Sequence, residues 1–249
     1  MTQWVFDLGN SRVKGAPLQA DGTLGEMRAF AYDEGLPAAL DAAMPAGGVR
    51  DASTAVLASV ASPSRTATVV DWLTTRFGSI SIARTQPALA GVRIAYDQPE
   101  RMGVDRFLAL LAARRRGAQP WLVVGVGTAV TIDLLDAQGR HHGGRIAPSP
   151  RLMRDALHAA AMQLPAQGGD YAEFATDTVD ALASGCDGAT LGLIERSLRQ
   201  ALDVLGQRPA LLLHGGGADA LASHLGEAEL APSLVLEGLA VWARLGADA

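Results

Sequence analysis

The sequence predicts an α/β protein built from two halves of similar design. Two segments carry this prediction, Trp4–Lys14 and Trp121–Leu135, and each reads as an apolar run, a reversal of small residues and a second apolar run. Laying 7–11 on 125–129 gives an offset of 125 minus 7, or 118 residues, close to half of the 249-residue chain. A period this long exceeds that of solenoid repeats and indicates a duplicated domain. We expect halves at 1–117 and 118–249, with the two hairpins facing each other across a cleft.

The first hairpin has the residue types that hold nucleotide phosphates. Gly9 lacks the Cβ that would keep the backbone from a phosphate, and Asn10 and Ser11 add side-chain donors. Asp7 is suited to hold Mg²⁺ directly or through water. An ordinary hairpin with polar turn residues is the alternative for this segment alone. The symmetry between the hairpins breaks at one position, because the counterpart of Asp7 is Gly125.

The rest of the first half alternates strands and helices. We expect a strand over Thr54–Ser59, a helix that Ser62 and Pro63 open and that runs to Phe77, and a strand over Ile80–Ala83, which together form a βαβ unit. A second helix opens at Gly103 and ends in three arginines, where cations suit the negative end of the helix dipole. Residues 117–120 then read as the linker between halves.

The second half repeats this order. Its two hairpin strands lead through a turn to a third strand over Arg140–Ile146, and a helix follows from about Pro150. After a polar loop, Thr176 or Asp177 caps a long helix that runs toward Leu205. A buried strand over 210–213 then enters a run of three glycines and another helix. A strand, glycines and a helix in succession form a place where an anion or a base can approach the backbone.

Composition narrows the function classes. The formal net charge of −5 argues against general affinity for nucleic acid. The most apolar segment, 121–135, is too short and too rich in Gly and Thr to span a bilayer, and no signal-like run precedes Asp7 and Arg12. The single cysteine, Cys186, excludes an internal disulfide and favours a reducing cytoplasm.

Asp105 is the second carboxylate that stands out. It falls in the first turn of its predicted helix, where unpaired amides and the dipole favour the ionised form. Arg106 beside it has the geometry to grip a substrate carboxylate with two hydrogen bonds. From composition and spacing alone, simple capping of the helix remains the stronger reading of Asp105.

Taken together, the motifs resemble those of the type III pantothenate kinases and the related Bvg accessory factor proteins. The resemblance runs from about Trp4 to Gly238 and rests on the order and approximate spacing of several motifs. These are 7–11 with Lys14, 103–106, 127–133, 143–148, 177–185 and 215–216.

The resemblance implies a fold of the superfamily that includes acetate kinase, sugar kinases, heat-shock chaperone ATPases and actin, with two ribonuclease H-like halves and ATP in the cleft between them. It implies transfer of the γ-phosphoryl group of ATP to pantothenate, giving 4′-phosphopantothenate for coenzyme A synthesis. Mg²⁺ and a monovalent cation, K⁺ or NH₄⁺, would be cofactors. It also implies a homodimer whose partner helps to close the pantothenate pocket.

The resemblance also implies roles for single residues. Asp105 would be the catalytic base and Asp7 would organise the metal. The ATP phosphates and adenine would be bound by Asp7, Gly9, Asn10, Ser11, Lys14, Gly127, Thr128, Gly215 and Gly216. Pantothenate would be bound by Tyr96, Gly103, Val104, Asp105, Arg106 and Thr178, with Arg106 binding its carboxylate.

Three positions depart from the family pattern. Gly125 stands where the family usually has aspartate, Ser149 where it has glycine, and His214 where it has threonine or serine. Because Gly125 removes a carboxylate from the metal and phosphate region, an alternative function is a weakly active or inactive pantothenate- or nucleotide-binding regulatory protein of the Bvg accessory factor type. A phosphate-cleaving relative in the same superfamily is a third possibility, which the 103–106 motif disfavours.

Overall fold

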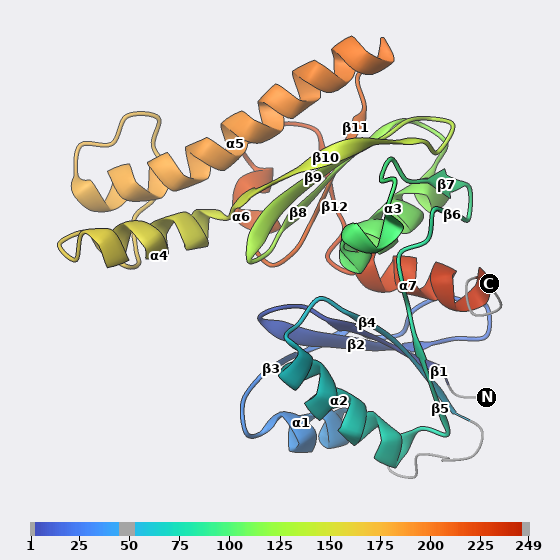
Figure 1. The fold of residues 1–249 in the computed structure, drawn as a ribbon. Coiled ribbons are helices and arrows are strands. Elements are labelled where there is room, and N and C mark those ends of the chain that lie inside the picture. Colours follow the sequence, from blue (N-terminus) through green and yellow to red (C-terminus); the bar gives the residue numbers. More distant parts are fainter. Residues whose placement is uncertain (1–2, 45–52, 246–249) are drawn as a thin grey trace. The chain divides into compact units, whose positions relative to one another are not determined.

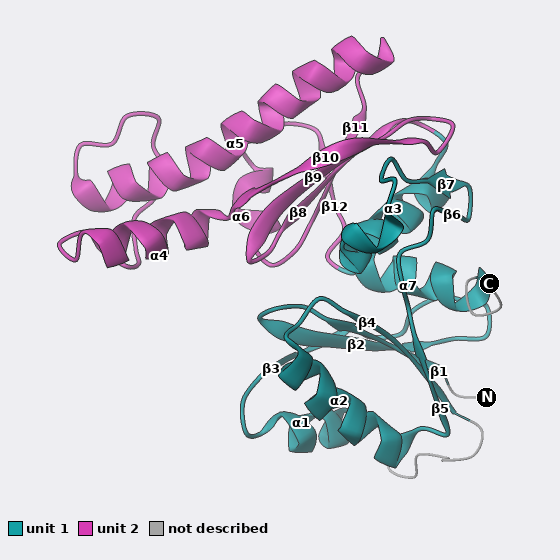
Figure 2. Cartoon of the chain, viewed as in Figure 1, with its two compact units in different colours: residues 1–118, 233–249 teal, residues 119–232 magenta. Residues whose placement is uncertain are grey.

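The chain forms two compact units. A computed structural model describes residues 3–44 and 53–245. One unit comprises Met1–Ala118 with Ser233–Ala249, and the other comprises Gln119–Pro232 (Figure 2). The C-terminal helix therefore belongs with the N-terminal part of the chain.

The first unit is built on a five-stranded sheet (Figure 1). Strand β1 (Gln3–Leu8) forms a hairpin with β2 (Arg12–Leu18), which pairs antiparallel with β3 (Arg28–Ala31). On the other side of β1, β4 (Thr54–Ser59) and β5 (Ser79–Ile82) run parallel to it. The sheet order is β3-β2-β1-β4-β5.

Helices cover both faces of this sheet. On one face, Trp4, Phe6 and Leu8 of β1 pack in one apolar cluster with α1 (Leu36–Ala43) and α2 (Pro63–Arg76). On the other face, β1 and β4 contact α7 (Leu234–Leu245), and α3 (Val104–Arg116) packs along α7 and also contacts β4. A Cβ at Gly238 of α7 would overlap the carbonyl oxygen of Leu108 in α3, so only glycine permits this close approach.

Short elements link β5 to α3. They are β6 (Ala88–Leu89), β7 (Val92–Arg93) and a 3-10 turn over Pro99–Arg101. The sequence reading did not predict these elements.

The second unit is built on a sheet of the same order (Figure 1). Strand β8 (Trp121–Val126) forms a hairpin with β9 (Ala129–Leu135), which pairs antiparallel with β10 (His141–Pro148). Strands β11 (Ala210–His214) and β12 (Ala228–Leu230) run parallel to β8. The helices are α4 (Pro150–Ala160), α5 (Thr178–Leu205) and α6 (Ala218–Ala222). Apolar residues of α5 and α6 pack on one face of the sheet.

The two units thus share one strand order, β3-β2-β1-β4-β5 and β10-β9-β8-β11-β12, with the same antiparallel and parallel pairings. The predicted α/β class is confirmed. Compact units are not the same as duplicated halves, since the C-terminal stretch groups with the first unit. The halves at 1–117 and 118–249 therefore stay a prediction.

Local sequence signals place the predicted elements. The Ser62 hydroxyl accepts the Arg65 N–H at the start of α2, and Asp177 accepts the N–H groups of Val179 and Asp180 at the start of α5. These are the N-cap contacts that the residue types favour. Strand β4 has the predicted ends, and α4 begins at Pro150 as predicted.

Within residues 3–44 and 53–245, no helix has both the length and the apolar character that crossing a membrane requires. Cys186 is a buried free thiol in α5.

Candidate active site

The first hairpin places Asp7 opposite a lysine. Asp7 in β1 pairs with Lys14 in β2, and the turn between the strands consists of residues 9–11. The Gly9 N–H donates to the carbonyl oxygen of Arg12 at 3.1 Å, which closes the turn. Asn10 and Ser11 at its tip are exposed. The hairpin therefore presents the short polar tip that the sequence predicts, with a carboxylate and an ammonium group at its base.

Asp7 is in an environment that disfavours a lone negative charge. Its side chain lies on the sheet face opposite Phe6 and Leu8, and the residue is only 9% exposed. Its pKa is raised from 3.8 to about 7, chiefly by burial and next by the negative charge of Asp105, while the charge of Lys14 acts in the opposite direction. A cation bound here would offset both effects and favour the charged form of Asp7.

Asp105 lies at the start of α3 and interacts with the helix terminus itself. Its Oδ1 accepts the backbone N–H of Arg106 at 2.9 Å, and the positive end of the helix dipole favours its charge. A Cβ on Gly103 would come within 2.7 Å of the same oxygen, so glycine at the N-cap leaves room for this carboxylate. The predicted base, Asp105, is thus held close enough to Asp7 to raise the pKa of Asp7.

Arg106 and Tyr96 form a second part of this region. Arg106 is only 6% exposed, although its side chain is charged. Its Nη1 donates to the hydroxyl of Tyr96 at 3.1 Å, and its guanidinium lies 5.8 Å from the centroid of the Tyr96 ring. The first unit therefore brings together the predicted base Asp105, its neighbour Arg106 and Tyr96 from the preceding loop. Gly103 and Val104 lie at the same helix start.

The second unit brings its predicted glycines together. The Gly217 N–H donates to the carbonyl oxygen of Val126 at 3.0 Å, which ties the loop after β11 to the end of β8. Gly215 has a φ of +93°, and a Cβ there would overlap the backbone of Val126, so this position requires glycine. Gly127 and Thr128 follow Val126 directly and are exposed, and a Cβ on Gly216 would meet no atom within 4 Å. A backbone-lined surface with room for a ligand results.

His214 fills the space beside Gly125. A Cβ on Gly125 would lie 2.8 Å from Oγ1 of Thr131 and 2.9 Å from Nε2 of His214. His214, Gly125 and Thr131 are aligned across three neighbouring strands, β11, β8 and β9. The backbone of Gly125 is not in the left-handed region. The two departures from the family pattern, at 125 and 214, therefore lie side by side. The imidazole of His214 lies where a side chain at 125 would project.

Asp133 does not compensate for Gly125. Its Oδ1 lies 2.9 Å from Nε2 of His141, and both side chains are buried. It pairs with Val123 in the strand register, two positions from Gly125 and farther from the turn. The carboxylate is thus engaged within the sheet.

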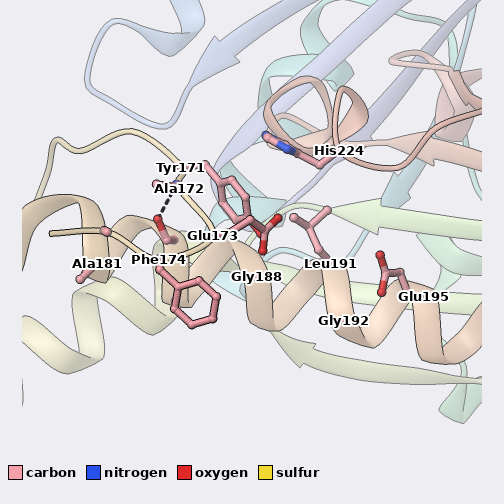
Figure 3. A pocket seen from close by; sticks show the side chains of 13 residues that line it. Tyr171, Ala172, Glu173, Phe174, Ala181, Gly188, Leu191, Gly192, Glu195 and His224 are labelled. Atoms are coloured by element: carbon pink, nitrogen blue, oxygen red, sulfur yellow. Dashed lines mark hydrogen bonds between the residues drawn. The ribbon is translucent and has the colours of Figure 1, made fainter.

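Thr178 lies apart from the other predicted residues of its unit. It is the first residue of α5, which joins the core of the sheet only from Leu191 onward, about 20 Å farther along the helix. Between these points a cavity of about 650 Å³ lies beside α5 and the segment 171–175 (Figure 3). None of the predicted site residues lines it. Its walls include Tyr171, whose ring centroid lies 4.5 Å from that of His224.

Sequence reasoning missed two residues that contact the first hairpin. The Tyr32 hydroxyl donates to the carbonyl oxygen of Gly9 at 2.9 Å, and Nη1 of Arg65 donates to the carbonyl oxygen of Asn10. Both residues are far from the hairpin in sequence, so no local pattern marks them.

The carboxylate of Asp7 is compatible with binding of Mg²⁺. Among the residues that the structure describes, no group of three or more His, Cys, Asp or Glu side chains gathers as a metal site. Mg²⁺ commonly uses one or two carboxylates and completes its shell with water and substrate phosphates. Asp7 offers such a carboxylate, because a bound cation would stabilise its ionised form against burial and the charge of Asp105.

Comparison with known proteins identifies the family. The sequence model of the type III pantothenate kinases matches residues 4–200. The chain is similar to the type III pantothenate kinase of Stenotrophomonas maltophilia strain K279a, with 59% identity over 98% of each chain.

Solved structures show the same fold at low identity. A Baf family protein from Campylobacter jejuni superposes with a TM-score of 0.63 at 16% identity and covers 97% of this chain and 98% of that one. A protein from Sinorhizobium meliloti, assigned as a 2-dehydro-3-deoxygalactonokinase, superposes with a TM-score of 0.61 at 17% identity over 97% and 99%. The chain therefore shares the fold of these two proteins. With a family model that covers most of its length and a relative that is 59% identical, the chain belongs to the type III pantothenate kinase family.

Proposed function

We propose that this protein phosphorylates pantothenate with ATP, giving 4′-phosphopantothenate for coenzyme A synthesis. The family supports the reaction. The observation that carries it is the placement of Asp105 beside both the buried Asp7 and the buried Arg106. The curated relative at 59% identity is named as the kinase and not as an inactive regulatory protein.

In the proposed reaction, the primary hydroxyl oxygen of pantothenate attacks the γ-phosphorus of ATP. The bond from that phosphorus to the bridging oxygen of the β-phosphate breaks, ADP leaves, and the hydroxyl proton passes to Asp105. A base for this step must reach the hydroxyl by a hydrogen bond. Arg106 would fix the other end of pantothenate by binding its carboxylate. Most of the rate enhancement in phosphoryl transfer comes from such positioning and from charge neutralisation.

The nucleotide would use both glycine-rich regions. Gly9, Asn10, Ser11, Gly127 and Thr128 would contact the phosphates, and Gly215 and Gly216 would border the adenine. Mg²⁺ held by Asp7 would supply charge neutralisation at the phosphates, and Lys14 would add to it. A monovalent cation, K⁺ or NH₄⁺, is part of the proposal because the family resemblance implies it.

We also propose that the active form is a homodimer located in the cytoplasm. Helix α4 has no buried residue, and its apolar side chains 152, 153, 156, 157 and 160 form one stripe. Two more apolar side chains between α4 and α5 are exposed, Met162 and Phe174, of which Phe174 is 96% exposed. A surface of this kind is typical of a protein–protein interface. Thr178 would bind pantothenate near that interface.

The test is a coupled assay for ADP with pantothenate, ATP, Mg²⁺ and K⁺. We expect pantothenate-dependent turnover by the parent and a loss of about 10²–10⁴-fold in kcat for Asp105→Asn, which keeps the shape but cannot accept the proton. The KM for ATP should change little.

Asp71→Asn is the matched control, since Asp71 is an exposed residue of α2 in the same unit. It should leave kcat unchanged. Turnover by Asp105→Asn near that of the parent would remove Asp105 from the role of base, and a parent without turnover would refute the kinase activity.

A further inference from the structure

Two side chains outside the predicted site hold the turn of the first hairpin from one side. Tyr32 follows β3, and its hydroxyl donates to the carbonyl oxygen of Gly9 at 2.9 Å. Arg65 lies in the first turn of α2, and its Nη1 donates to the next carbonyl oxygen, that of Asn10. The guanidinium of Arg65 also lies over the ring of Tyr32, 4.7 Å from its centroid. The two side chains therefore support each other as well as the turn.

These contacts fix the direction of two peptide planes. In a trans peptide the C=O and the following N–H point in opposite directions. With the carbonyls of Gly9 and Asn10 directed at Tyr32 and Arg65, the N–H groups of Asn10 and Ser11 are directed to the opposite side of the turn. Successive N–H groups oriented to one side form a concave surface that suits an anion. Tips of short exposed turns are otherwise among the least ordered parts of a protein.

We infer that Tyr32 and Arg65 are positioning residues for the nucleotide: they hold the Gly9–Ser11 turn in the conformation that accepts the ATP phosphates. This inference rests on the proposed function, because that function places phosphate at the turn. Neither residue needs to touch ATP or pantothenate for the role.

The chemistry of Tyr32 and Arg65 suits residues that must hold the turn at every pH of the assay. The pKa of Tyr32 is raised to about 12 by burial and by the negative charge of Asp7, with Arg65 acting in the opposite direction. The hydroxyl therefore keeps its proton and remains a donor throughout the range in which the enzyme is assayed. Arginine stays charged as well, and its planar group both stacks and donates, which lysine cannot do in the same way.

The experiment measures nucleotide binding and turnover separately for Tyr32→Phe, Arg65→Ala and Arg65→Lys. A fluorescent ATP analogue with Mg²⁺ reports affinity, and the coupled assay gives kcat and the KM for each substrate. Loss of one hydrogen bond to the turn should weaken nucleotide affinity and raise the KM for ATP about 3- to 10-fold in Tyr32→Phe. The kcat and the KM for pantothenate should stay within about twofold of the parent. Arg65→Lys should recover less than half of the loss in Arg65→Ala.

Arg76→Ala is the matched control, because Arg76 ends the same helix and pairs with Asp41 at 2.6 Å. It should lower thermal stability without a change in the KM for ATP. If Tyr32→Phe and Arg65→Ala behave like this control, the pair is only structural and the inference is overturned. Full rescue by Arg65→Lys would show that only the positive charge of Arg65 matters. That result would overturn its role as a positioning residue.

The outcomes for the parent separate this inference from the proposed function. A parent that binds the nucleotide but does not phosphorylate pantothenate would refute the proposed function. The role of Tyr32 and Arg65 would then be judged from the nucleotide affinities of the variants. A parent that does not bind the nucleotide would overturn both.

Discussion

Asp7→Asn is expected to stabilise the metal-free protein, and to do so increasingly as the pH rises. The pKa of Asp7 is raised from 3.8 to about 7, chiefly by burial and then by Asp105. Between these two pH values the folded chain binds a proton that the unfolded chain releases, so the stability of the parent falls as the pH rises toward 7. Each unit of difference corresponds to about 1.36 kcal/mol, which makes the full decline ~4 kcal/mol.

Because Asn carries no charge, the variant escapes this decline. Urea unfolding in EDTA at pH 5, 6, 7 and 8 should show a gain for Asp7→Asn that is ~1.6 kcal/mol at pH 5 and approaches ~4 kcal/mol at pH 8, less whatever hydrogen bonding the amide loses. Adding Mg²⁺ and ATP should stabilise the parent more than the variant, since binding to the folded state raises its apparent stability.

Asp21→Asn is the control in the same unit. Its pKa is lowered by hydrogen bonds from the backbone N–H and the hydroxyl of Thr23, so its contribution is present above its ordinary pKa and is lost as the pH falls. It should show no gain that grows with pH. A difference between Asp7→Asn and the parent that is independent of pH would refute the assignment of Asp7 as a buried carboxylate under electrostatic stress.

Three further predictions concern single positions. Arg106→Ala should raise the KM for pantothenate about 10- to 150-fold, whereas an analogue without the carboxylate should bind equally to parent and variant in a competition assay; unequal binding would indicate a structural arginine. Gly125→Asp should lose about 1–3 kcal/mol in thermal melts, because its Cβ would crowd His214, and His214→Thr should restore most of this loss. Additive losses in the double variant would contradict that coupling. Leu157→Glu should dissociate the proposed dimer in sedimentation experiments and Leu230→Glu, at a similarly exposed leucine, should not; equal behaviour would contradict the proposed interface.

Much of the fold was predictable because its signals are local. The hairpin at Asp7, the Ser62–Pro63 start of α2 and the Asp177 cap of α5 each depend on a few adjacent residues, and the structure places all three as expected. Helix α7 was not predicted. Its sequence is apolar on most sides, so periodicity says little, and its return to the first unit depends on the fit of Gly238 against α3.

The site was predictable to a different degree. The residues that form short motifs were found from sequence, and within each unit several of them lie together, as at Asp105 and Arg106. Tyr32 and Arg65 were missed because they contact the hairpin across 23 and 55 residues of sequence. The pairing of His214 with Gly125 was also hidden, since only the strand register places them side by side.

The close packing of Gly238 against α3 has a consequence for the order in which the two units fold. The unit of residues 119–232 is continuous in sequence, whereas the unit that contains Asp7 and Asp105 needs α7, which the ribosome makes after all of 119–232. Domains generally fold as units during synthesis. The unit of residues 119–232 is therefore complete in sequence before α7 is made, and α3, which carries the proposed base in its first turn, lacks part of its packing until α7 follows.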